Sequence, residues 1–308
     1  MIDEKASIPM FGSSVDSFLA RSSAKRRKGV FGGVLSTRNI DTPMGLVRVY
    51  DSGSESPCVV LTPDGPNVIE HYERLIELLS PRLRVVCFDM PGFGHSYPQP
   101  RYEHSLDQGA RVVLGVLDGL GIKTATLAFS CANGFYALRA AQIAPERISN
   151  LVLSQTPSLT AMHAWANRVI PWPLRIPVLG QLLAWFFRHR AARDWYHIAL
   201  PRTTKPKPFQ EKALAALSGG ACFCLAGVVQ GLSGEQEASL VGTRTPLMMV
   251  WGAKDRSHRH TDPKSLHACA PQAEIVHFQD CGHFPDVEQP ERFAEILMER
   301  MARYSFQR

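Results

Sequence analysis

Two kinds of hydrophobic repeat alternate along most of the chain. Short β-branched runs predict strands, and apolar residues at helical spacing, such as Ile69, Tyr72 and Ile76, predict helices between them. The predicted strands are residues 47–50, 58–62, 84–89, 125–130, 150–154, 246–251 and 274–278, and the predicted helices are 69–79, 106–120, 132–143 and 290–304. Strands that alternate with helices favour an α/β fold with a mostly parallel sheet and helices on both of its faces.

The alternation stops between about residues 155 and 242, where the sequence is helical and rich in Trp and Pro. We therefore expect one domain with a helical lid insertion. Its expected parts are a basic N-terminal arm (1–30), a core (31–155 and 243–308) and a helical cap (156–242). Such a cap would lie over the carboxyl ends of the strands, where open α/β sheets bind ligands.

Charge and composition limit the classes of binding partner that we expect. The formal net charge is +6, but much of the basic excess lies in residues 21–28, which we interpret as a solvated arm. The sequence pattern does not indicate a basic face with interleaved aromatic residues, so we expect no nucleic-acid partner. Residues 178–187 are apolar but too short to span a membrane, and they indicate a buried or interfacial helix. We expect no transmembrane segment, although weak association with a membrane surface stays open.

The seven cysteines are odd in number and lack paired metal-ligand spacing, which favours a reducing compartment. The N-terminus is charged where a signal peptide would be apolar, so we expect a cytoplasmic protein. A phosphate-binding glycine loop and a clustered ligand set are also missing from the sequence, so we expect neither a cofactor nor a metal.

The segment that carries chemistry contains Phe129-Ser130-Cys131-Ala132-Asn133, between a predicted strand and a predicted helix. It resembles the nucleophile elbow of the α/β-hydrolase superfamily, usually written G-x-S-x-G. Aligning the flanking text from both sides places Cys131 at the nucleophile position. A shifted register would place Ser130 there instead, and an inert buried thiol at Cys131 is a third interpretation. The helix N-terminus and a nearby imidazole would lower the thiol pKa toward neutrality.

Two further segments follow the same resemblance. Residues 280–290 contain Gly282-His283 and resemble the family's C-terminal histidine segment, which implies that His283 is the general base. Asp255 follows the penultimate predicted strand and would be the acid that orients the histidine. Both occur in the family's chain order of nucleophile, acid and histidine. His258 and His260 lie in a charged loop and are expected to be solvated.

The resemblance also implies an oxyanion hole formed by the backbone N–H groups of Ala132 and Gly65. Four residues depart from the family pattern: Phe129 and Asn133 are not small, Pro63 and Asp64 precede Gly65 in a loop that normally opens His-Gly, and the Asp64 carboxylate is awkward beside an oxyanion. The candidate pocket residues are Asp64, Phe129, Asn133, Trp165 and Trp185.

These residues predict covalent acyl transfer through a Cys-His-Asp triad. The expected substrate is a small-molecule ester, thioester or lactone with an apolar acyl portion, and the acyl group would pass to water or to another acceptor. Two alternatives stay open. One is a noncovalent catalyst of the cyclase or lyase kind on the same fold, and the other is a catalytically silent protein that binds a small ligand.

Overall fold

The computed structural model describes residues 11–25 and 35–305, and these residues are arranged around one central sheet. Within them the sheet has nine strands in the order β1-β2-β4-β3-β7-β8-β10-β11, with β6 paired to β2. The strands are β1 (Thr37–Thr42), β2 (Gly45–Asp51), β3 (Cys58–Thr62), β4 (Arg84–Phe88), β6 (Tyr97–Pro98), β7 (Ala125–Ser130), β8 (Ile148–Ser154), β10 (Leu247–Gly252) and β11 (Glu274–Phe278). From β4 to β11 all neighbouring strands are parallel, whereas β2 is antiparallel to β1, β4 and β6.

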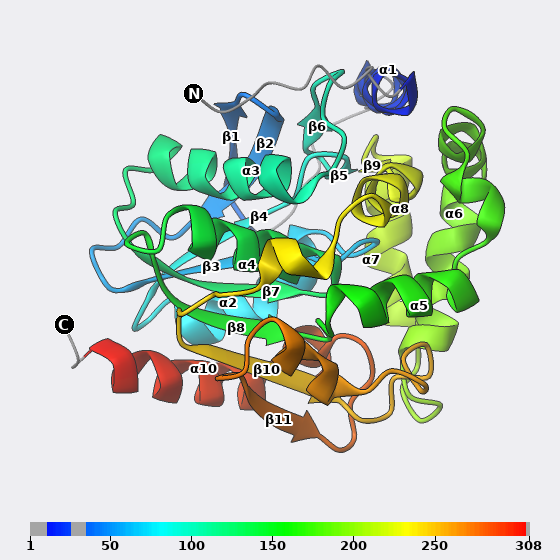
Figure 1. Cartoon of the computed structure of the whole chain (residues 1–308). Coiled ribbons are helices and arrows are strands. Elements are labelled where there is room, and N and C mark those ends of the chain that lie inside the picture. The colour runs from blue at the N-terminus through cyan, green and yellow to red at the C-terminus, as the bar shows by residue number, and fades with distance from the viewer. Residues whose placement is uncertain (1–10, 26–34, 306–308) are drawn as a thin grey trace.

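Helices cover both faces of this sheet (Figure 1). One face packs against α3 (Leu106–Gly119) and α4 (Ala132–Ile143), and the other packs against α2 (Glu73–Leu79) and α10 (Pro290–Ser305). Successive side chains of a strand point to opposite faces, so Phe129 of β7 lies in the first cluster and Ala128 in the second. Removal of both apolar layers from water drives the assembly. The predicted α/β class with a mostly parallel sheet is confirmed.

The chain between β8 and β10 is mostly helical and lies to one side of the sheet in Figure 1. Its elements are α5 (Leu159–Val169), η2 (Trp172–Arg175), α6 (Leu179–Ala199), α7 (Lys207–Ser218), β9 (Cys222–Phe223), α8 (Leu225–Ser233) and η3 (Glu237–Leu240). The shorter elements of the rest are η1 (Ile69–Tyr72), β5 (Phe93–Gly94), η4 (Pro263–Ala268) and α9 (Pro285–Glu288). The division of the chain into a core and a cap at 156–242 stays a prediction.

The N-terminal region differs from the expected solvated arm. Residues 1–10 and 26–30 of that arm lie outside the described residues, but Phe11–Lys25 form helix α1, which packs beside α6 and β6. The hydroxyls of Ser13 and Ser17 donate to the carbonyls of Pro100 (2.7 Å) and Pro98 (2.9 Å). Because the inward face of α1 is small and polar, it lacks the apolar stripe that predicts a packed helix.

Among the described residues, none of the helices combines the length and the hydrophobicity needed to cross a bilayer. Segment 178–187, predicted to be a buried or interfacial helix, forms the N-cap and the start of α6, and several of its large apolar side chains are exposed.

Candidate active site

Cys131 occupies a strained corner between β7 and α4. Its backbone φ is 52° and ψ is −124°, a conformation that residues other than glycine rarely adopt. The corner aims the side chain into a cavity of about 600 Å³, which Cys131 lines. Its neighbour on the strand, Ser130, is fully buried, and its hydroxyl donates to Asp286 Oδ2 (2.6 Å). The geometry therefore favours the register with Cys131 as the nucleophile over the register with Ser130.

The close approach of helix and strand at this corner falls at Gly134. A Cβ there would lie 2.2 Å from Thr156 Oγ1, so a larger residue cannot fit without movement. This explains how Asn133 is accommodated at the place where the family has a small residue. The Asn133 Nδ2 donates to the carbonyl of Pro63 (2.9 Å), which ties the start of α4 to the loop after β3.

His283 comes from the loop after β11 and lies next to the cavity-lining residues Asp64 and Cys131, without lining the cavity itself. Its ring is fully buried, and Nδ1 donates to Asp255 Oδ2 at 2.6 Å. The backbone N–H of His283 donates to the carbonyl of Ala199 at the end of α6 (2.9 Å). The structure thus brings together the histidine and the carboxylate that the sequence proposes as partners.

Asp255 is itself held in place by a residue that the sequence analysis missed. The Gln155 Nε2 donates to Asp255 Oδ2 (2.6 Å), and the N–H of Gly252 donates to Gln155 Oε1 (2.7 Å). Burial opposes ionisation of Asp255, but the charge and the hydrogen bond of His283 outweigh it and lower the Asp255 pKa to about 2. Gln155 directly follows the predicted strand 150–154, and this position was the signal that could have identified it.

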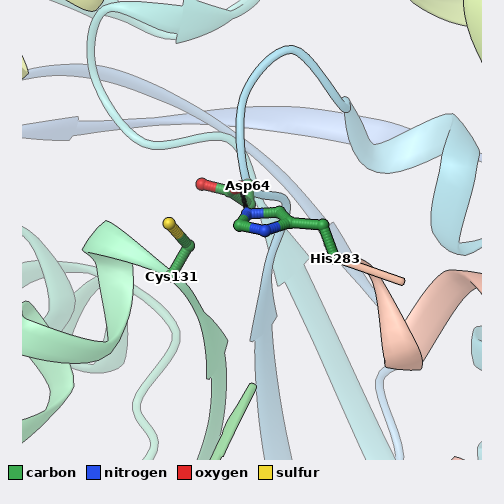
Figure 2. A group of neighbouring side chains, drawn as sticks. All are labelled: Asp64, Cys131 and His283. Atoms are coloured by element: carbon green, nitrogen blue, oxygen red, sulfur yellow. Dashed lines mark hydrogen bonds and ion pairs between the residues drawn. The ribbon is translucent and has the colours of Figure 1, made fainter. Parts of the chain in front are cut away.

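Asp64 is a third group at the imidazole. Its Oδ2 lies 3.1 Å from His283 Nε2, so the ring bridges two buried carboxylates. The Cys131 Sγ, an Asp64 carboxylate oxygen and a ring nitrogen of His283 lie within 4.8 Å of one another. Figure 2 shows the three side chains converging from the end of β7, the loop after β3 and the loop before α9. Asp64 therefore competes with the Cys131 thiol for Nε2.

Burial and neighbouring charges control the protonation states of these three side chains. It raises the pKa of Cys131 to about 11, and the Asp64 charge adds to the increase, while His283 and the Ala132 N–H lower it by less. The expected shift toward neutrality is therefore wrong, because desolvation of the thiolate outweighs the helix terminus. Burial also raises the Asp64 pKa. Burial alone would lower the His283 pKa, but the negative charge of Asp255 opposes this, and the His283 pKa is raised well above its ordinary value. The resting thiol is protonated and needs a base.

Gly65 and Ala132, the proposed oxyanion donors, both line the cavity beside Cys131. Ala132 is the first residue of α4, so its N–H is among those that lack an acceptor within the helix. A Cβ on Gly65 would lie 2.5 Å from the ring of Phe93, which explains why glycine stands there. The Asp64 carboxylate lies next to Gly65 and faces the same space.

Two of the candidate pocket residues lie elsewhere. Phe129 is fully buried in the core and meets the ring of Phe88 edge to face, because strand alternation turns it away from the cavity. Trp185 packs under Arg188, 4.6 Å from the guanidinium carbon to the ring centroid, and its Nε1 donates to Ser23 of α1 (3.4 Å). Neither lines the cavity. The prediction that they belong to the pocket is therefore corrected.

Asp64, Asn133 and Trp165, the other candidates, do line the cavity. Trp165 stacks on His258, which in turn stacks on His283, with ring centroids 4.8 Å and 5.4 Å apart. His258 is thus buried rather than solvated, because its flat ring fits between two others. Burial lowers its pKa to about 3. His258 therefore stacks on the His283 ring as a neutral group.

Two sets of side chains are close enough to hold a cation among the described residues: Asp64, Cys131 and His283, and Asp255, His258 and His283. Both share the imidazole. Hydrogen bonds to Asp255 and Asp64 already hold the shared imidazole in place, and we assign no metal to either set.

Comparison with known proteins now adds to this geometry. The profile of the alpha/beta hydrolase family matches residues 59–296. The chain belongs to this family. The predicted resemblance to the family is therefore confirmed, while the assignment of a cysteine as the nucleophile stays a prediction.

Several relatives and structural neighbours of this alpha/beta hydrolase are named as hydrolases, and others are named as haloalkane dehalogenases. Haloalkane dehalogenase 2 of Mycobacterium tuberculosis (strain ATCC 25618 / H37Rv) is 26% identical over 281 residues, which cover 86% of this chain and 94% of that protein. Zearalenone hydrolase of Bionectria ochroleuca is 32% identical over 129 residues, which cover 40% of this chain and 48% of that protein. Epoxide hydrolase A of Mycobacterium thermoresistibile superposes with a TM-score of 0.73 at 16% identity, over 86% of this chain and 98% of the other. These relatives support an enzyme of the hydrolase class.

Proposed function

We propose that this alpha/beta hydrolase cleaves an ester, thioester or lactone through a covalent intermediate on Cys131. The observation that carries the proposal is the position of the Cys131 sulfur. It lies at the strained corner on the floor of the cavity, within 4.8 Å of an imidazole whose other nitrogen is hydrogen-bonded to Asp255. A nucleophile, a base and a group that orients the base are the parts that acyl transfer needs.

In the proposed reaction, His283 Nε2 takes the thiol proton as Sγ attacks the substrate carbonyl carbon. The oxyanion forms beside the N–H groups of Gly65 and Ala132. Collapse of the tetrahedral species expels the leaving group, which receives the proton from His283, and leaves a thioester on Cys131. A water molecule then attacks this thioester, gives its proton to His283, and releases the carboxylic acid and the thiol. An amine or thiol acceptor in place of water would give acyl transfer.

Asp64 sets a condition on this reaction. Its carboxylate takes the place at Nε2 that the thiol proton needs, and a negative charge there opposes the oxyanion. We infer that the substrate carbonyl displaces Asp64 from Nε2 on binding and that Asp64 is protonated in the reactive complex. Its raised pKa is in line with this inference.

The apolar acyl portion is inferred from the cavity walls. Beyond Cys131 the cavity is lined mainly by apolar side chains of the inserted helices, among them Met162, Trp165, Leu183 and Leu232. A volume of about 600 Å³ lies in the range of pockets that enclose small molecules. The polar lining residues Asp64 and Asn133 lie on the same side as Cys131, and the other polar lining residues are His163, Arg190, Asp194 and Ser233.

The test is to incubate the protein with a p-nitrophenyl ester, quench, and measure intact mass and the site of acylation. We expect one acyl group on Cys131, no adduct on Cys131→Ala, and an undiminished adduct on the cysteine control Cys58→Ser. His283→Ala should acylate far more slowly. An adduct on Ser130, or release of p-nitrophenol that survives Cys131→Ala, contradicts the covalent mechanism.

One observation favours a second candidate, noncovalent acid–base catalysis. The Asp64 carboxylate and His283 Nε2, 3.1 Å apart, already form a proton-transfer pair that does not require the thiol. In that case Cys131→Ala retains turnover while His283→Ala and Asp64→Ala both lose it. A silent binding protein would show ligand binding and no turnover in the wild-type protein.

A further inference from the structure

A group of large apolar side chains is exposed on η2 and the first half of α6. The group, which we name the α6 apolar face, consists of Trp172, Ile176, Val178, Leu179, Leu182 and Phe186. Trp172 and Phe186 are each 68% exposed. Soluble proteins rarely leave so many large apolar residues together in water unless the surface binds something.

The face is a continuous surface rather than scattered residues. Leu179, Leu182 and Phe186 are three and four positions apart on α6, so they form one stripe on the side that faces solvent. The opposite side, with Gly180 and Ala184, is buried against the rest of the molecule. η2 packs directly on α6 and adds the exposed ring of Trp172.

The charged residues in this stretch of the chain are mostly basic. Between residues 168 and 194 the chain has five arginines and a single acidic residue. The arginines are Arg168, Arg175, Arg188, Arg190 and Arg193, and the acidic residue is Asp194. Asp194 pairs with Arg190 at 3.4 Å. An apolar stripe with a cationic border is the pattern of a helix that lies in the interface of an anionic bilayer.

The entrance of the cavity lies partly on the same helix. The exposed residues that line the cavity are Pro171, Phe187, Arg190, Asp194, Ile198 and Ser233. Four of them follow the apolar face along α6, Pro171 precedes η2, and Ser233 ends α8. A molecule held against the α6 apolar face is therefore close to one side of the entrance.

We propose that the α6 apolar face docks this enzyme on an anionic lipid bilayer. Trp172 and Phe186 would enter the headgroup region, and the arginines would meet lipid phosphates. Resting on the proposed function, the same docking identifies the substrate class as acyl esters that partition into lipid, because α6 carries both the apolar face and one side of the cavity entrance.

A second copy of the chain fits this surface less well. A two-fold dimer would set each arginine-bordered face against itself and bring like charges together. A bilayer that contains anionic lipid instead offers the complementary charge.

The experiment is flotation of the full-length protein with phosphatidylcholine vesicles, with and without phosphatidylglycerol. We expect binding to the anionic vesicles that weakens as salt rises, because exposed charges are screened. In the variant Trp172→Ser/Phe186→Ser, the ratio of vesicle-bound to free protein should fall about tenfold or more, because the two largest apolar groups of the face are removed. The control Ile143→Ser/Val241→Ser removes two exposed apolar residues from other elements and should bind as the wild type does.

A second measurement fixes the orientation. Quenching of tryptophan fluorescence by brominated lipid should fall in Trp172→Phe, which keeps the apolar surface and most of the binding. The proposal is overturned if the protein binds to neither kind of vesicle, or if both double variants bind equally well. It is also overturned if sedimentation shows a dimer that Trp172→Ser/Phe186→Ser dissociates, because the face would then be a protein interface.

Failure of this proposal is separable from failure of the catalytic one. Vesicle binding is measured without turnover, and acylation of Cys131 by a water-soluble ester is measured without vesicles. Trp172 and Phe186 do not line the cavity, so their double variant should hydrolyse the soluble ester at the wild-type rate.

Discussion

Asp64→Asn should shift the pH dependence of catalysis toward lower pH. In the wild-type protein, the Asp64 carboxylate stabilises the protonated form of His283, which cannot accept a proton from Cys131. Replacement by asparagine removes that negative charge and lowers the His283 pKa. The neutral base is then populated at a lower pH, so the acidic limb of kcat/KM moves down.

The distance between the two groups sets the magnitude. At the 3.1 Å between Asp64 Oδ2 and His283 Nε2, an effective dielectric constant of about 20 gives an attraction of about 5 kcal/mol between unit charges. This corresponds to an upper limit of about 4 pH units. Partial protonation of Asp64 and reorganisation of the site reduce the effect, and we expect a shift of at least about one unit.

The assay is release of p-nitrophenol from a soluble ester between mildly acidic and alkaline pH. The matched control is Asp280→Asn, which removes an exposed carboxylate three residues before His283 that pairs with Lys254. It should leave the profile in place because solvent screens exposed charges. If the acidic limb of the kcat/KM profile does not shift in Asp64→Asn, or shifts to higher pH, the role assigned to Asp64 is refuted.

Three further substitutions test other parts of the structure. Ser130→Ala should keep acylation of Cys131 but lower the free energy of unfolding in urea by about 1–3 kcal/mol, since Asp286 loses a buried donor; loss of the adduct would restore Ser130 as a nucleophile. Gly134→Ala forces a Cβ to within 2.2 Å of Thr156 Oγ1 and should destabilise by about 1–3 kcal/mol, so unchanged urea unfolding would show that the corner can relax. Burial raises the Asp16 pKa from 3.8 to about 7. Folding therefore takes up a proton, and the wild type loses stability as pH rises through that interval. Asp16→Asn should gain up to about 4 kcal/mol relative to the wild type between pH 4 and pH 8, and equal pH dependence of the two proteins would contradict this.

Strand ends explain why much of the site could be predicted from sequence. Cys131 directly follows a predicted strand, and Asp255 and His283 lie in the loops after two others. Parallel strands place their carboxyl ends at one edge of the sheet, so residues far apart in sequence meet there. The family resemblance supplied which of these residues to choose, and the geometry then brought His283 and Asp255 into contact.

Side-chain direction explains what could not be predicted. β7 is buried on both faces, so its pattern does not reveal that Phe129 points into the core. The burial of His258 depends on two rings that arrive from other parts of the chain. The approach of Asp64 to Nε2 likewise depends on how a short loop turns after β3, a detail that local sequence does not encode.

The contact between His283 and the end of α6 has a mechanical consequence. The backbone N–H of His283 is bonded to the Ala199 carbonyl, and the Arg256 guanidinium is bonded to the carbonyl of His197 on the same last turn. α6 has 21 residues and behaves as a rod about 30 Å long. Whatever tilts this rod at its exposed apolar end also displaces the imidazole at the other end. A guest molecule that shifts α6 on entering the cavity would therefore also shift the imidazole that accepts the proton.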